Sequence, residues 1–148
     1  MTEQLKKEGT VQAPGKVIYT AKTRTTGGRD KGASRSSDGQ LEVKLSRPGS
    51  PRPGTNPEQL FATGWSACFE SALQHAARRR KITLPEVAID AEVDLHLEEG
   101  EYFLSARFNV SLPGLDGEIA RALVEDAEQI CPYSKATRGN VDVTFNLA

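Results

Sequence analysis

The sequence is poor in sulfur and in histidine, with two cysteines, one methionine and two histidines among 148 residues. The cysteines, Cys68 and Cys131, lie 63 residues apart. A structural zinc site needs about four ligands at short spacings, and neither His75 nor His96 extends the cysteine pair into such a cluster. We therefore expect no metal site and no cofactor. A cysteine pair in a reducing compartment is more often catalytic or simply buried than a structural disulfide.

An excess of charge of one sign and long apolar runs are also lacking. Lys and Arg number 19 and Asp and Glu 20, so the formal net charge is −1 and no basic field favours a nucleic-acid partner. The longest strongly apolar stretch, residues 60–69, is about half the length that a membrane-spanning helix needs. No apolar segment near the N-terminus resembles a secretory signal. We expect a cytoplasmic protein with neither nucleic acid nor membrane as a partner.

What the sequence does contain is enough for one folded domain. Hydrophobic residues make up 37% and charged residues 26% of the chain, as is usual for globular proteins. Residues 1–15 are polar and end in Ala-Pro-Gly, which is typical of a loose arm. We therefore predict a single domain over residues 1–148 with a loose N-terminal arm at 1–15.

Alternation of apolar and polar residues predicts the strands. It is strict over residues 87–98 and 104–112, which are joined by a turn at 99–101 and should pair as half-exposed antiparallel strands. Residues 16–23 and 41–45 predict an earlier hairpin, and residues 141–147 a last strand. With one helix after each pair, this order predicts an α+β fold of antiparallel sheet with helices on its apolar face.

Two helices are predicted between these strands. The first runs from residue 57 to about 81, because Asn56 fits an N-cap and Pro57 the first helical position. Its middle is apolar on nearly every side, which is typical of a buried central helix. The second covers residues 116–130 and ends at Cys131-Pro132.

Cys68 lies inside the first helix and is the candidate nucleophile, although a buried, inert cysteine is the plainer interpretation. An apolar site raises the pKa of a thiol, so a reactive Cys68 needs a cation nearby. Arg29 could supply it and Glu58 could orient Arg29; the alternatives are a solvated turn arginine and an acid that favours the helix dipole. In one straight helix, Glu58 and Cys68 are about 15 Å apart. Either the helix breaks near Gly64, or these groups meet across a subunit interface.

Several motifs together resemble the organic hydroperoxide resistance (Ohr) proteins of the OsmC/Ohr superfamily. They are Thr26-Gly-Gly-Arg-Asp30, Asn56-Pro-Glu-Gln-Leu-Phe-Ala62, Ser66-Ala-Cys-Phe69 and Cys131-Pro-Tyr-Ser134. The resemblance runs in the same order over roughly residues 17–148. The chain departs from the pattern at Trp65, where a tyrosine is usual, and in residues 47–54, which are usually richer in glycine.

This resemblance implies a thiol peroxidase that acts in oxidative stress defence. Cys68 would be the peroxidatic cysteine, Cys131 the resolving cysteine that closes a disulfide, Arg29 the activator of the thiolate and Glu58 the residue that positions Arg29. The resemblance further implies an OsmC/Ohr-like, intertwined homodimer with active sites at its interface. It implies a lipoylated protein or dihydrolipoamide as the reductant.

The aromatic residues near Cys68 bear on the substrate. Phe61, Trp65 and Phe69 offer an apolar wall, which favours a bulky organic hydroperoxide of the fatty-acid type over hydrogen peroxide.

Three other interpretations of the sequence stay open. A sister OsmC-type peroxidase would share the cysteines and differ in reductant and substrate preference. A redox sensor would form the disulfide but turn over poorly. A structural or small-molecule-binding α+β module would form no Cys68–Cys131 bond after exposure to peroxide.

Overall fold

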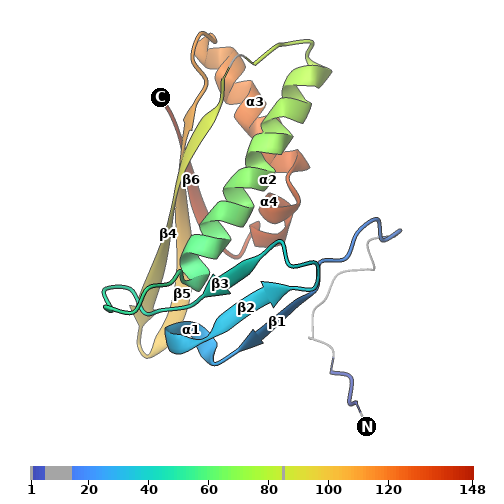
Figure 1. The fold of residues 1–148 in the computed structure, drawn as a ribbon. Helices are drawn as coiled ribbons and strands as arrows, with labels where there is room; N and C mark the ends of the chain where they lie inside the picture. Colours follow the sequence, from blue (N-terminus) through green and yellow to red (C-terminus); the bar gives the residue numbers. More distant parts are fainter. Residues whose placement is uncertain (1, 6–14, 85) are drawn as a thin grey trace.

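The computed structural model describes residues 2–5, 15–84 and 86–148, which form two three-stranded sheets and four helices (Figure 1). The elements follow one another as β1 (Thr23–Thr26), α1 (Gly28–Lys31), β2 (Ala33–Ser36), β3 (Glu42–Lys44), α2 (Pro57–Arg79), β4 (Ala88–Glu98), β5 (Glu101–Ser111), α3 (Gly117–Ile130), α4 (Pro132–Thr137) and β6 (Asp142–Leu147). Within the described residues, no helix is both long and apolar enough to cross a membrane. The α+β class predicted from the sequence is confirmed.

The larger sheet is built around the two strongly alternating segments, which form β4 and β5 as predicted. They pair antiparallel from Ala88 opposite Ser111 to Glu98 opposite Glu101. Glu99 and Gly100 turn the chain with φ of 50° and 82°, the left-handed conformation that a tight two-residue hairpin needs. Because successive side chains point to opposite faces, one face of the sheet is polar and the other is covered by helices.

Helix α2 lies across the apolar face of this sheet and contacts both β4 and α3 (Figure 1). The side chain of Asn56 accepts a hydrogen bond from the backbone N–H of Gln59 at 2.9 Å, and Pro57 occupies the first helical position. The predicted start of the helix is therefore confirmed. Of the two alternatives for bringing Glu58 and Cys68 together, a helix break near Gly64 is wrong, because α2 continues without interruption to Arg79.

Aromatic side chains from three elements fill the core between α2 and the sheet. Phe69 of α2 meets Phe108 of β5 edge to face, with ring centroids 5.6 Å apart, and stacks on Phe145 of β6 at 5.0 Å. Phe69 and Phe108 have no exposed surface. These contacts fix α2, and with it Cys68, relative to the sheet.

The smaller sheet, β1–β2–β3, lies beside the N-terminal end of α2 (Figure 1). Its residues are exposed or at most half-buried, so it buries little within one chain. The strand predicted at residues 16–23 is mostly wrong, since β1 begins only at Thr23 and pairs with β2. β3 pairs with β2 and not, as predicted, with the first strand.

Two features of the C-terminal third also differ from the prediction. β6 pairs parallel to β5, so the larger sheet is mixed, because alternation identifies a strand but not its direction. The short helix α4 was not predicted. Of the proposed loose arm at 1–15, residues 1 and 6–14 lie outside the described residues.

Candidate active site

Cys68 is presented by the middle of α2, on the side of the helix that faces α4. It is half-buried and packs against the hydrophobic core. Its neighbour Phe69 points into that core and has no exposed surface. Cys68 therefore sits at the border between core and surface, where its sulfur can be both fixed and reached.

Cys131 stands at the junction of two helices. It ends α3, with its N–H bonded to the carbonyl of Ala127, and it precedes Pro132, the first residue of α4. A residue before proline is disfavoured in the helical conformation, and Cys131 adopts φ −64° and ψ 122°. The proline thus breaks one long helix into two and turns Cys131 inward, where it is completely buried.

The two sulfurs meet although 63 residues separate them. Both cysteines are free thiols, and Cys131 lies close enough to Cys68 to raise the pKa of the Cys68 thiol. Burial raises this pKa more than Cys131 does. The backbone of Tyr133 acts in the opposite direction on the Cys68 pKa. In a single chain the balance therefore favours the protonated thiol.

Arg29 and Glu58 form an ion pair at the start of α2. The Arg29 guanidinium donates to a Glu58 carboxylate oxygen at 2.6 Å, and Glu58 is the more buried partner. The hydrogen bond to Glu58 raises the pKa of Arg29. Gly27, just before α1, and Gly28, its first residue, bring Arg29 to this position by taking φ of 81° and 76°.

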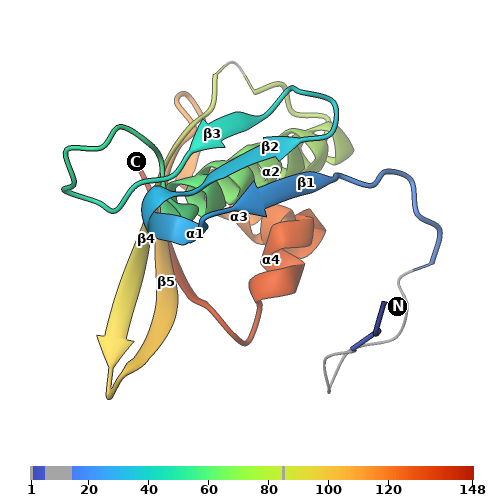
Figure 2. The same cartoon turned by 60° about the horizontal axis from the view of Figure 1, so that its bottom comes forward.

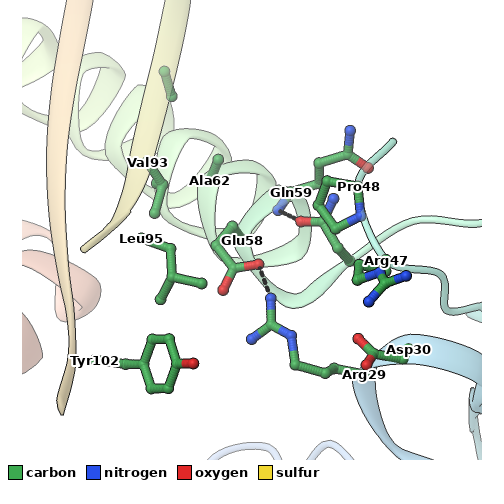
Figure 3. A pocket seen from close by; sticks show the side chains of 12 residues that line it. Arg29, Asp30, Arg47, Pro48, Glu58, Gln59, Ala62, Val93, Leu95 and Tyr102 are labelled. Carbon is green, nitrogen blue, oxygen red and sulfur yellow. Dashed lines mark hydrogen bonds and ion pairs between the residues drawn. The ribbon is translucent and has the colours of Figure 1, made fainter. Parts of the chain in front are cut away.

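A cleft of about 760 Å³ opens beside the ion pair, between the start of α2, the loop after β3 and the β4–β5 hairpin (Figure 3). In Figure 3, Arg29 points toward Glu58, while Leu95 and Tyr102 face the pair from the hairpin. Most of the surface that lines the cleft is apolar.

The cleft does not reach Cys68 in a single chain. Cys68 is not among its lining residues, and no arginine of the described chain is among the groups that shift the Cys68 pKa. The structure therefore brings Arg29 to Glu58 and Cys68 to Cys131 but leaves these two pairs apart, because α2 is unbroken between Glu58 and Cys68. No group of three or more potential metal ligands occurs in the part of the chain that the structure describes.

The three aromatic residues predicted as a substrate wall lie at different depths. Phe61 is half-buried, whereas Trp65 and Phe69 have no exposed surface. The Trp65 ring is enclosed by Phe61 and Phe108, at centroid distances of 5.6 and 4.8 Å. Phe61 can therefore meet a substrate directly, while Trp65 and Phe69 support the site from the core. Their part in substrate binding stays a prediction.

Two residues that sequence analysis gave no role complete the surroundings of the sulfurs. The backbone of Tyr133 acts to lower the pKa of Cys68, and the Tyr133 hydroxyl lies against Gly64, where a Cβ would come within 2.8 Å of it. Ser134 accepts a hydrogen bond from the Trp65 indole at 3.2 Å. The signal for both was Pro132, because a proline after a helix end can begin a new helix.

Comparisons with known proteins agree with this geometry. The family model described as OsmC-like protein matches residues 47–146. The organic hydroperoxide resistance protein of Xanthomonas axonopodis pv. citri is 46% identical over 141 residues, which cover 92% of this chain and 99% of that protein. The protein OhrA of Bacillus subtilis is 43% identical and covers 88% of this chain and 96% of its own length. The crystal structure of the organic hydroperoxide resistance protein OhrB of Bacillus subtilis superposes with a TM-score of 0.85 at 42% identity, covering 89% of this chain and all of that one.

Proposed function

Because the chain belongs to the OsmC-like proteins, and within them to the organic hydroperoxide resistance proteins, we propose that it is a thiol peroxidase that reduces organic hydroperoxides in oxidative stress defence. One observation carries the proposal: two free thiols from distant parts of the chain lie close enough for Cys131 to raise the Cys68 pKa, one half-buried and one fully buried. This is the arrangement that a peroxidatic and a resolving cysteine require.

The proposed reaction has three steps. The Cys68 thiolate attacks the terminal oxygen of the hydroperoxide; the O–O bond breaks, and the alkoxide takes a proton and leaves as an alcohol. The resulting Cys68 sulfenic acid then condenses with the Cys131 thiol, which forms the disulfide and releases water. A dithiol finally reduces the disulfide by two thiol–disulfide exchanges and is itself oxidised. We assign the dithiol to the lipoyl class, free or protein-bound.

The first step needs a cation, because burial raises the pKa of Cys68 and only the thiolate is nucleophilic. We assign this cation to Arg29, held by Glu58, and infer that it comes from a second copy of the chain. An unbroken α2 separates the two pairs within one chain. A two-fold dimer would contain two such composite sites.

Apolar side chains that are exposed in the single chain support this dimer. Val17, Ile18 and Tyr19 are 73%, 90% and 75% exposed in the segment before β1. Figure 2 shows the β4–β5 hairpin extending beyond the other elements, and Leu97 and Tyr102 near its tip are 64% and 68% exposed. Clustered apolar side chains of this kind mark protein–protein contact sites.

The lining of the cleft beside Arg29 supports an organic substrate. Ala62, Val93, Leu95 and Tyr102 contribute apolar surface on the side facing the ion pair. An alkyl chain gains free energy by leaving water for such a surface, whereas hydrogen peroxide has no apolar part. We therefore propose a hydroperoxide with a bulky or fatty-acid-type organic group, and Phe61 as a further contact for it.

Stopped-flow kinetics of the reduced protein test the proposed function. Mixed with cumene hydroperoxide, the protein should consume one equivalent rapidly and gain a Cys68–Cys131 disulfide, detected as a loss of two mass units by mass spectrometry. Hydrogen peroxide should react more slowly. Equal slow rates with both peroxides would contradict the proposal and would favour a sensor or a binding module.

A further inference from the structure

The two segments that carry the reactive sulfurs are joined by a second, buried contact. The indole N–H of Trp65 donates to the hydroxyl of Ser134 at 3.2 Å. Trp65 precedes Cys68 by three residues on α2, and Ser134 follows Cys131 by three residues on α4. The hydrogen bond therefore links the same two segments that the Cys68–Cys131 disulfide would link.

The donor side of this contact has little freedom to move. Trp65 has no exposed surface, and its ring meets Phe61 at an interplanar angle of 81° and Phe108 at 60°. These contacts fix the plane of the indole and hence the direction of its N–H. Because indole nitrogen is a donor only, it needs an acceptor in this interior.

The position of Ser134, the acceptor, depends on this hydrogen bond more than the position of Trp65 does. Ser134 is 3% exposed and belongs to α4, which has only six residues. A helix this short is not stable by itself, so its position depends on its contacts with the rest of the molecule. The other buried hydroxyl of α4, that of Thr137, donates only to carbonyls of its own helix, those of Tyr133 and Ser134. The Ser134 hydroxyl, in contrast, connects α4 to α2.

We propose that the Trp65–Ser134 hydrogen bond holds Cys131 at Cys68 before oxidation, which makes Trp65 and Ser134 positioning residues for disulfide closure. The inference rests on the proposed function and extends it to the second step. In that step the Cys131 sulfur displaces water from the Cys68 sulfenic acid, forming an S–S bond. Closure competes with a second hydroperoxide, which would oxidise the sulfenic acid to sulfinic acid. A fixed Cys131 favours closure, because correct placement of reacting groups raises the rate.

Ser134→Ala and Trp65→Phe test the proposal from the two ends of the bond. Each reduced protein is mixed with one equivalent of cumene hydroperoxide, quenched with N-ethylmaleimide at set times and analysed by mass spectrometry. A misplacement of about 1 Å can cost roughly a hundredfold in rate, and the partial loosening here should slow closure by about tenfold. When the hydroperoxide is instead added at increasing concentration, sulfinic acid on Cys68 should appear at about tenfold lower peroxide concentration than in the unchanged protein. In Ser134→Ala the first step, measured as peroxide consumption, should keep its rate.

Two comparisons separate positioning from a general loss of packing. Thr137→Val removes a hydroxyl that is also buried, 7% exposed, from the same helix, but it leaves the bond to α2 intact, so closure should keep its rate. The double variant Trp65→Phe/Ser134→Ala should close no more slowly than Trp65→Phe alone, because both changes remove one interaction. If Ser134→Ala does not fold, Trp65→Phe and Thr137→Val still provide the test.

Several results would overturn the proposal. They are closure at the unchanged rate in Ser134→Ala or Trp65→Phe, equal slowing in Thr137→Val, or additive effects in the double variant. Oxidation with diamide, which needs no hydroperoxide, separates the two claims. If the unchanged protein forms the disulfide with diamide but not with a hydroperoxide, the proposed peroxidase function fails. The role of the Trp65–Ser134 hydrogen bond in disulfide closure can still be judged from the rates with diamide.

Discussion

The two cysteines differ in exposure, and this difference fits the roles proposed for them. Cys68 is half-buried and lies at the border of the core, whereas Cys131 is completely buried at the junction of α3 and α4. A hydroperoxide arriving from solvent can reach only the more exposed sulfur. Cys131 can meet Cys68 without any contact with the substrate, as a resolving thiol should.

Replacing each cysteine in turn should therefore stop different steps. Cys68→Ser should abolish peroxide consumption, because it removes the nucleophile. Cys131→Ser should allow one turnover at an unchanged rate and then accumulate sulfenic and sulfinic acid on Cys68. Single-turnover kinetics with mass spectrometry distinguish these outcomes. Loss of the first turnover in both variants would mean that Cys131 also takes part in the attack.

The activation of Cys68 can be tested through its pH dependence. Burial and Cys131 raise the Cys68 pKa, so without a cation the thiolate forms only as the pH rises above the ordinary range of a thiol. If Arg29 supplies the charge, the rate of attack should level off near neutral pH in the unchanged protein. In Arg29→Ala it should be more than about tenfold lower at pH 7 and should keep rising into the alkaline range.

The control for this prediction is Arg29→Lys, which retains the charge but loses the planar fork that pairs with Glu58. The Cys68 pKa in this variant should lie between its values in the unchanged protein and in Arg29→Ala. Glu58→Gln should raise the Cys68 pKa less than Arg29→Ala does, because it leaves the positive charge of Arg29 in place and removes only the ion pair that orients the guanidinium. A thiolate absorbance titration that is identical in all four proteins would return Arg29 to the role of a surface turn residue.

Among the elements, α2 connects both halves of the site, because Glu58 lies in its first turn and Cys68 in its middle. Its start depends on Asn56, whose side chain bonds to the N–H of Gln59. Asn56→Ala should lower the free energy of unfolding by about 1 kcal/mol, measured by urea denaturation. Asn56→Asp retains an acceptor and should be close to the unchanged protein; an equal loss in both would argue against the cap.

The elements that sequence analysis predicted are those whose signal is local. α2 has its cap and its proline, and β4 and β5 have strict alternation that one buried face imposes. β1 and β2 were missed because Thr-Arg-Thr-Thr and Ala-Ser-Arg-Ser have no apolar face to bury in one chain. Residues 16–23 have strand composition, but for most of their length they have no strand partner among the residues that the structure describes, and β propensity alone does not make a strand.

The candidate site also contains features that local sequence signals predict and features that depend on the whole fold. The pairing of Glu58 with Arg29 could be inferred from the motifs, whereas the roles of the two cysteines stay predictions. The depth of Trp65 and Phe69 could not, since an apolar helix gives no sign of which face meets the sheet. The contact between Trp65 and Ser134 depends on the fold as a whole, because 69 residues separate the two side chains.

At the scale of the whole molecule, the single chain exposes apolar surface that a folded protein normally buries. The smaller sheet packs on little else in the chain, and apolar side chains are exposed both before β1 and at the hairpin tip. We expect a two-fold dimer that buries more than about 2,000 Å² in total. Light scattering after size-exclusion chromatography should give a mass twice that of the 16.1 kDa chain.

Mixing of inactive variants tests whether the active site is shared between subunits. If Arg29 of one subunit acts on Cys68 of the other, co-refolded Arg29→Ala and Cys68→Ser chains should regain about a quarter of the full activity, because half of randomly paired two-fold dimers are mixed and each has one complete site. Cys68→Ser mixed with Cys131→Ser should regain none, since these two sulfurs meet within one chain. Multiple-turnover peroxide consumption with a dithiol reductant measures both mixtures. The reverse pattern, recovery only in the second mixture, would mean that the disulfide and not the arginine crosses the interface.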